Sequence, residues 1–164
     1  MITMFITIGI LTVLGVLVII LWYNNFFYKS DNYVLSFKES MDLTDLPVIT
    51  FYNGEEKLNF LLDTGSDKSY INKHILKKLS YEKSNFKTSA MGIDGTPKEC
   101  NAIQMHIHYK DLDFNELFFV MDLKDSFDTI KKESGVTING ILGSVFFRKY
   151  GYMLDFEKLK VKIK

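Results

Sequence analysis

Hydrophobic residues dominate the beginning of the chain. No charged side chain occurs before Lys29, and residues 2–22 are an almost unbroken apolar run. A helix of this length would reach across the roughly 30 Å hydrocarbon core of a bilayer, and the aromatic residues between 22 and 28 are typical of a membrane interface. We therefore predict a transmembrane helix over residues 1–22. A cleaved signal peptide is the alternative, although no basic residue precedes the run and no small-x-small cleavage site follows it.

Few charges flank this apolar segment. Lys29 and Lys38 follow it, which favours a cytoplasmic location for the rest of the chain by the positive-inside tendency. Residues 23–45 are mixed polar and aromatic without a sustained period, and we predict a linker there. The prediction is thus a single-pass membrane protein with one folded domain over residues 46–164, since 164 residues leave no room for two full domains.

From Leu46 onward the pattern changes to that of β-structure. Two apolar runs, 48–52 and 58–62, flank Asn53-Gly54, a dipeptide that accepts the positive φ angles of a tight hairpin turn. Farther on, residues 103–109 alternate apolar and polar side chains with the two-residue period of a half-buried strand. These patterns predict a mainly β domain.

Shorter signals complete the predicted domain. Residues 71–79 have helical spacing behind Asn72 as a helix cap, and Asp94-Gly95 predicts a second hairpin between residues 87–93 and 96–105. We also expect a return strand at 115–121, a helical turn near 127–132, a short helix over 144–150 and a final strand pair, 152–156 with 159–163.

A short acidic motif follows the first hairpin. The apolar residues 60–62 run directly into Asp63-Thr64-Gly65-Ser66. Alone, Asp-Thr/Ser-Gly is a weak signal, because average composition places it in roughly one chain in ten of this length. Much later in the chain a second apolar segment ends in Ile141-Leu142-Gly143 and leads into the predicted helix over 144–150. The order and spacing of these two segments make the motif more specific.

This arrangement resembles the retropepsin family, the retroviral aspartic proteases and their bacterial single-domain relatives. In that family a hairpin, an Asp-Thr/Ser-Gly-Ala/Ser loop, a flap hairpin, and two hydrophobic residues with a glycine before a short helix follow in this order. The resemblance covers residues 46–164. It implies an all-β fold with two or three short helices, in which a closed β-barrel protomer forms a homodimer. It also implies aspartic endopeptidase activity on a peptide or protein substrate.

The resemblance carries over to individual residues. Asp63 would be the catalytic carboxylate, Thr64 would lock the two loops together across the dimer, and Gly65 would leave room for the paired carboxylates. Ser66 would hydrogen-bond the outer carboxylate oxygen, and the tip of the second hairpin would be the flap. The expected substrate-binding residues are Ser66, Gly92, Ile93, Asp94, Gly95, Ile141 and Leu142.

The chemistry of peptide hydrolysis explains why one such motif is not enough. Without a metal or a covalent nucleophile, one group must take a proton from water while another donates a proton to the carbonyl oxygen. Two neighbouring carboxyls do this because both cannot ionise together. The chain has no second Asp-Ser/Thr-Gly: residues 94–96 have the wrong order and residues 128–130 lack the glycine. We therefore predict that the second carboxylate comes from another copy, in a two-fold homodimer.

Other chemical groups are weaker candidates. His106 and His108 point to the same side of a strand and could bind zinc, but they share its polar face with Gln104, and no cysteine or third histidine is near. Ser134 lacks the flanking pattern of a nucleophile. The single Cys100 rules out an intrachain disulfide framework. We therefore predict no metal and no cofactor.

The charge balance and the fold leave one alternative function open. Lys and Arg number 20 against 20 Asp and Glu, so no basic footprint predicts a nucleic-acid partner. Because a fold does not fix a function, the same dimeric barrel could be a non-catalytic, membrane-anchored binding or sensor module. The intact motif of residues 63–66 favours the protease, since a purely structural loop would not need it.

Overall fold

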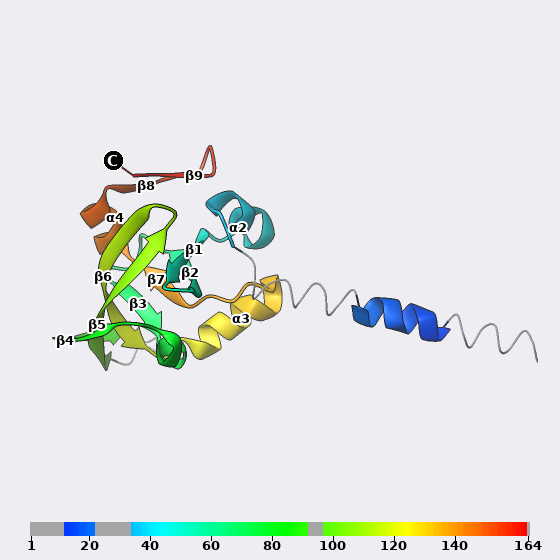
Figure 1. Cartoon of the computed structure of the whole chain (residues 1–164), viewed down its shortest axis with the longest axis horizontal. Coiled ribbons are helices and arrows are strands. Elements are labelled where there is room, and N and C mark those ends of the chain that lie inside the picture. The colour runs from blue at the N-terminus through cyan, green and yellow to red at the C-terminus, as the bar shows by residue number, and fades with distance from the viewer. Residues whose placement is uncertain (1–11, 22–33, 92–96, 164) are drawn as a thin grey trace, which may run out of the picture. The chain divides into compact units, whose positions relative to one another are not determined.

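The computed structural model describes residues 12–21, 34–91 and 97–163 (Figure 1). The chain divides into two compact units, Met1–Tyr33 and Val34–Lys164. In the first unit, residues 12–21 form a helix whose large apolar side chains are exposed.

The structure corrects the predicted membrane location. No helix within the described residues is both long and apolar enough to cross a bilayer. The rest of the predicted span, residues 1–11 and 22, lies outside the described residues. The prediction of a single-pass membrane protein with a cytoplasmic domain is therefore contradicted.

The predicted linker, residues 23–45, contains structure that the sequence did not indicate. Its part before Val34 lies outside the described residues, whereas Phe37–Thr44 forms helix α2 behind a capping box. Leu35 is 1% exposed, and its N–H donates to Thr50 Oγ1 at 2.7 Å. The folded unit thus starts earlier than predicted, because the buried Leu35 and Phe37 belong to it. The sequence did not indicate this, since the short segment has no periodic pattern.

Strands dominate the second unit (Figure 1). Within the described residues, six strands close a barrel in the order β1-β2-β7-β3-β6-β5, with β5 meeting β1 where His108 lies opposite Tyr52. Strand β4 pairs with β5 outside this ring. The predicted closed, mainly β barrel is confirmed. The strands of this sheet are β1 (Val48–Asn53), β2 (Glu56–Leu62), β3 (Ser69–Asn72), β4 (Glu82–Met91), β5 (Pro97–Tyr109), β6 (Leu112–Met121) and β7 (Gly140–Leu142).

Short helices and a separate strand pair complete the second unit. The predicted helix over 144–150 is confirmed as α4, and the predicted final pair as β8 and β9. Helix α3 is longer than the single turn expected. Only Phe127 of its residues is buried, and such a polar helix has a weak hydrophobic pattern, so the sequence predicted only part of it. These elements are the 3-10 helix η1 (Lys73–Lys78), α3 (Lys124–Ser134), α4 (Ser144–Tyr150), β8 (Tyr152–Asp155) and β9 (Lys160–Ile163).

The first hairpin has the predicted strands but a different turn. Strands β1 and β2 pair antiparallel up to Asn53 opposite Glu56, so the turn consists of Gly54 and Glu55. Gly54 has a φ of 59°, a left-handed conformation that glycine adopts without strain. Asn53 belongs to the sheet and is 6% exposed. The turn is therefore one residue later than predicted.

Aromatic rings fill the barrel. Phe51, Phe60, Phe118 and Phe146 are all 0% exposed. Phe60 stacks on Phe118 with ring centroids 5.3 Å apart, and Phe51 meets Phe60 edge-on at 5.9 Å. Phe146 comes from α4 and lies 6.2 Å from Phe51. Full burial of each ring stabilises the fold by roughly 1.5–3 kcal/mol. This packing fixes α4 against the barrel, next to the loop that carries Asp63.

Candidate active site

Asp63 follows β2 at a place where two parallel strands end side by side. Strand β2 pairs with β7, with Leu61 opposite Ile141 and Leu62 opposite Leu142. The backbone N–H of Asp63 donates to the Leu142 carbonyl at 3.0 Å. The structure therefore brings together the two segments that the sequence motif singled out.

The loop after Asp63 turns around its own carboxylate. The Gly65 N–H donates to Asp63 Oδ1 at 2.9 Å, and the Ser66 N–H donates to the Asp63 carbonyl at 3.2 Å. The Asp63 side chain is half-buried, whereas Thr64 and Gly65 are exposed. A Cβ added at Gly65 would lie 3.2 Å from Asp63 Oδ1, a tight contact. The loop thus presents one carboxylate, oriented by a backbone N–H, beside exposed residues.

The turn between β7 and α4 packs closely against this loop and hydrogen-bonds to it. The Ser144 N–H donates to the Ser66 carbonyl at 2.7 Å. Gly143 lies so close to the loop that a Cβ there would be 2.2 Å from the Lys68 carbonyl oxygen and 2.9 Å from that of Ser66. Real Cβ atoms do not approach backbone this closely, so only glycine fits without a shift of the loop.

Ser66 makes a different contact from the one that the resemblance implied. Its hydroxyl was expected to hydrogen-bond the Asp63 carboxylate. In the structure it donates to the Lys68 carbonyl at 2.8 Å, because serine hydroxyls readily bond to backbone groups close in sequence. Ser66 therefore stabilises the shape of the loop.

Ile141 and Leu142 lie in different environments. Leu142, for which the resemblance implied a substrate contact, is 0% exposed and its side chain belongs to the barrel core. Its contribution to the site is the carbonyl that holds Asp63. Ile141 is half-buried against a second apolar cluster that includes Tyr70 and Phe119.

The predicted flap hairpin is present as β4 and β5, which pair antiparallel as far as Met91 opposite Pro97. The tip between these residues lies outside the described residues. The structure therefore gives no placement for the expected substrate-binding residues Gly92, Ile93, Asp94 and Gly95.

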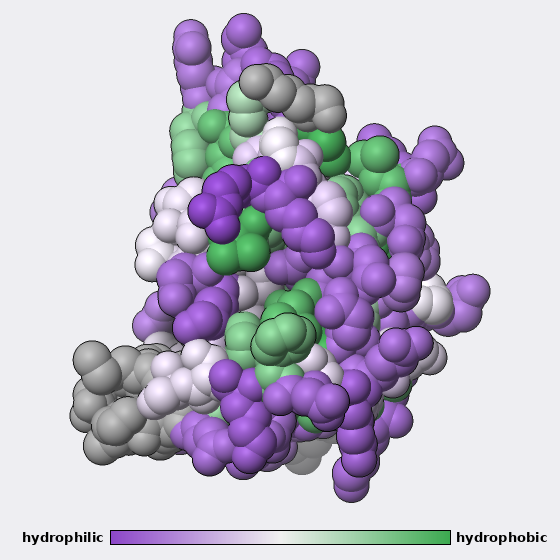
Figure 2. Space-filling model, turned by 90° about the vertical axis from the view of Figure 1, so that its left-hand side faces the viewer, coloured by the Kyte–Doolittle hydropathy of each residue, from purple (hydrophilic) through white to green (hydrophobic). Residues whose placement is uncertain are grey.

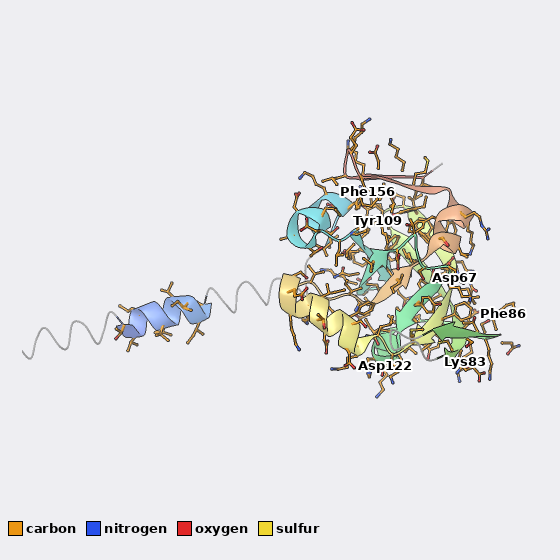
Figure 3. The ribbon with its side chains drawn as sticks, turned by 180° about the vertical axis from the view of Figure 1, so that it is seen from behind. Asp67, Lys83, Phe86, Tyr109, Asp122 and Phe156 are labelled. Carbon is orange, nitrogen blue, oxygen red and sulfur yellow. The ribbon has the colours of Figure 1, made fainter. Side chains whose placement is uncertain are left out.

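A lysine connects the Asp63 loop to the hairpin formed by β4 and β5. Lys68 Nζ donates to Thr88 Oγ1 on β4 at 2.9 Å. Phe86, two residues earlier on β4, is 68% exposed. Figure 3 shows Phe86 and Asp67, which precedes Lys68, on the same side of the folded unit. The loop and β4 therefore border one region of the surface, a relationship that the sequence did not indicate.

Sequence reasoning also missed a buried carboxylate near the site. Glu116 on β6 is 2% exposed. Its Oε1 accepts from Ser69 Oγ at 3.1 Å and its Oε2 from Lys149 Nζ at 3.2 Å. Burial raises the pKa of Glu116, and the contacts with Lys149 and Ser69 oppose this rise. The available signal was the period of two, since Phe114, Glu116 and Phe118 share the inward face of β6.

The weaker candidates have structural partners of their own. His106 Nδ1 lies 2.8 Å from Asp113 Oδ2, and His108 stacks on Tyr52 with ring centroids 5.4 Å apart. Among the described residues, no group of three or more His, Cys, Asp or Glu is placed to hold a metal ion. The Ser134 hydroxyl donates to a backbone carbonyl within α3.

Comparison with protein families assigns the chain to a class. Residues 48–146, more than half of the chain, match the family model described as aspartyl protease. The chain belongs to the aspartyl protease family. This membership confirms the family resemblance found in the sequence, and the matched residues include both Asp63 and Gly143.

Solved structures with a similar fold include two retroviral-type proteins. The retroviral protease-like domain of Ddi1 from Leishmania major is 11% identical with a TM-score of 0.48, and the match covers 73% of this chain and 88% of that chain. EIAV protease, in complex with the inhibitor HBY-793, is 21% identical with a TM-score of 0.43, and the match covers 68% of this chain and 93% of that chain. The sequence matches no curated protein.

Proposed function

We propose that the protein is an aspartic endopeptidase whose active site is formed by two copies of the chain, each of which contributes Asp63. The observation that carries this proposal is the position of Asp63 on a loop fixed at the adjoining ends of β2 and β7. Thr64 and Gly65 are exposed beside it, so a second copy can approach. Membership of the aspartyl protease family supports the same reaction.

Two Asp63 carboxyls would divide the chemistry between them. When they lie close together, the ionisation of one opposes that of the other, so one is protonated while the other is a base at the same pH. The base takes a proton from water as the water attacks the peptide carbonyl, and the acid donates its proton to the carbonyl oxygen. A single Asp63 could not do both, which makes the dimer part of the mechanism.

The β8–β9 hairpin supports such pairing. Among the described residues it pairs with no strand of the barrel, so each of its strands has an edge with unpaired backbone groups. Met153 on β8 and Val145 on α4 are 45% and 38% exposed. Figure 2 shows hydrophobic patches among hydrophilic residues on the face where Figure 1 places these elements. We infer that a second copy covers this surface.

A peptide or protein substrate would lie between the paired Asp63 loops and the β4–β5 hairpins. The hydrogen bond from Lys68 to Thr88 supports this placement, because it holds the hairpin beside the loop. We expect the substrate to contact the hairpin tip, residues 92–95, and the half-buried Ile141.

The proposal is tested with the full-length chain at a concentration where sedimentation shows a dimer. We expect the wild type to cleave members of a peptide library and Asp63→Asn to cleave none while it stays dimeric, because the amide has nearly the same size but cannot act as a base. Asp111→Asn, in the exposed turn between β5 and β6, is the matched control and should cleave like the wild type. A dimeric wild type that cleaves nothing favours the non-catalytic binding module.

A mixing experiment tests whether both copies contribute. If protomers exchange freely, a ninefold excess of Asp63→Asn should lower the activity to about a tenth of that of the wild type alone, because most wild-type chains then pair with an inactive copy. The same excess of Asp111→Asn should raise the activity. Full wild-type activity in the first mixture would show that one chain suffices.

A further inference from the structure

The buried carboxylate of Glu116 is linked to Asp63 by a continuous series of contacts. The Ser69 hydroxyl donates to Glu116 Oε1 at 3.1 Å and accepts from the Gly143 N–H at 3.3 Å. Gly143 directly follows Leu142, whose carbonyl accepts the Asp63 N–H at 3.0 Å. Residues from β3, β6 and β7 thus connect an inward-facing acid to the backbone of the candidate catalytic residue.

The ends of this series fix the direction of the hydrogen bonds in it. The backbone N–H of Gly143 can only donate, so the Ser69 oxygen accepts from it, and the hydroxyl hydrogen of Ser69 donates to Glu116 Oε1. Ser69 is 1% exposed, so bulk water does not compete for its hydroxyl. Without the carboxylate, the hydroxyl could rotate and the Gly143 N–H would lose its fixed acceptor.

Glu116 also contacts the other end of helix α4. Its Oε2 accepts from Nζ of Lys149, in the last turn of the helix, at 3.2 Å. At the other end, the Ser69 hydroxyl accepts from the N–H of Gly143, the N-cap residue of the helix. Glu116 thus contacts the last turn of α4 directly, through Lys149, and the start of the helix indirectly, through Ser69. Because the Ser144 N–H at the start of the helix holds the carbonyl of Ser66, a shift of α4 would move the Asp63 loop.

Stability alone does not explain this carboxylate. Burial of a charge is unfavourable, and an ion pair with a partner that is 46% exposed offsets only part of that cost. The neighbours of Glu116 on the inward face are Phe114 and Phe118, so an apolar side chain would suit the same position. What an apolar residue could not provide is an acceptor for the Ser69 hydroxyl, whereas Lys149 Nζ also donates to the Asn115 carbonyl at 2.6 Å.

We propose that Glu116 is a positioning residue, which acts through Ser69 and the Gly143 turn to hold the Asp63 loop in the geometry that two paired carboxyls require. The catalytic consequence rests on the proposed protease function. The effect on the backbone of Asp63 and Gly143 does not depend on that function, and it can be measured separately.

Threonine and valine at position 69 separate the hydroxyl from the shape of the side chain. The two residues differ in shape very little, and only threonine can donate to Glu116. In the full-length protein we expect Ser69→Thr to keep most of the wild-type kcat. Ser69→Val should lower kcat by about 10- to 100-fold with KM little changed, because small misplacements of catalytic groups have effects of this size. Equal kcat values for the two variants of an active enzyme overturn the inference.

Amide hydrogen exchange, followed by NMR, gives a readout that needs no activity. The N–H groups of Asp63 and Gly143 should exchange faster in Ser69→Val than in Ser69→Thr, while the amides of β1 should exchange alike and control for global stability. If the wild type cleaves no peptide, the proposed function fails, and the exchange rates alone test whether Glu116 and Ser69 position the Asp63 loop. Equal exchange at Asp63 and Gly143 in both variants then overturns the positioning role, and unequal exchange supports it.

Discussion

The carbonyl oxygen of Leu142 accepts the backbone N–H of Asp63 at 3.0 Å. The side chain of Leu142 is 0% exposed within the aromatic core of the barrel. Core packing therefore holds Leu142 in place, and its carbonyl in turn holds the backbone of Asp63. The parallel pairing of β2 and β7 sets this contact. Changes at the turn that follows Leu142 should therefore affect stability and catalysis together.

Gly143→Ala tests the close approach of this turn to the Asp63 loop. The added Cβ would lie 2.2 Å from the Lys68 carbonyl oxygen, so the backbone must move. We expect the free energy of unfolding, measured with urea, to fall by about 1–3 kcal/mol or more. Peptide cleavage by the remaining folded protein should also fall, because the loop that carries Asp63 shifts.

Gly54→Ala is the matched control for that variant. A Cβ at Gly54 meets no atom within 4 Å, but its φ of 59° strains any other residue by about 1–2 kcal/mol. We expect lower stability with unchanged cleavage per folded dimer, since the turn between β1 and β2 is remote in the fold from the β7–α4 turn. Wild-type stability and activity in Gly143→Ala would contradict the steric argument.

Asp122, labelled in Figure 3, should make stability depend on pH in the acid range. Hydrogen bonds from Lys73 Nζ, at 2.7 Å, and from the Lys124 N–H lower its pKa from 3.8 to about 2. A carboxyl whose folded-state pKa is depressed stabilises the fold above its unfolded value, and this contribution is lost as pH falls through the folded-state value. Asp122→Asn should therefore unfold more easily than the wild type near pH 5 and about equally near pH 2.

The Lys73 contact can be isolated by a second substitution. Lys73→Met removes the largest cause of the lowered pKa of Asp122. Because the two residues act as a pair, the double variant should lose little more stability near pH 5 than either single variant. Losses that simply add would show that Asp122 and Lys73 contribute independently.

Elements with a strong local signal were predictable from the sequence. The alternation over 103–109 predicted β5, and the glycine after two apolar residues predicted the start of α4 at Ser144. Helix α2 buries only Phe37 and Ser40 among its residues, so it shows no apolar stripe. The membrane prediction was wrong because no helix within the described residues is both long and apolar enough to cross a bilayer.

The motif predicted which segments carry the site, but not every contact within it. Asp63 and Gly143 follow apolar segments whose order is readable along the chain. The pair of Ser69 and Glu116 depends instead on the parallel register of β3 and β6, in which Ser69 lies opposite Phe118. No local pattern specifies a pairing between strands that are distant in sequence. The polar support of the site was therefore visible only in the fold.

Glu116→Gln should separate the stability of the fold from the geometry of the site. Burial raises the pKa of Glu116 above its ordinary value of 4.5. A group with a raised folded-state pKa contributes its full stability below the unfolded value and loses that contribution as pH rises through the folded-state value. A neutral amide has no such dependence. The free energy of unfolding of the variant relative to the wild type should therefore increase as pH is raised from about 4 toward neutrality.

Activity should change in the opposite sense. The amide of glutamine can accept from only one of Ser69 and Lys149, and its uncharged oxygen is a weaker acceptor for the Ser69 hydroxyl than a carboxylate oxygen. Lys149 keeps the Asn115 carbonyl, 2.6 Å from its Nζ, as an acceptor. We expect kcat to fall at neutral pH, where the relative stability of the variant is greatest. Urea unfolding across this pH range and peptide cleavage at neutral pH measure the two effects. A relative stability that falls with rising pH would contradict the burial of the charge, and an unchanged kcat would mean that the Asp63 loop keeps its geometry without the carboxylate.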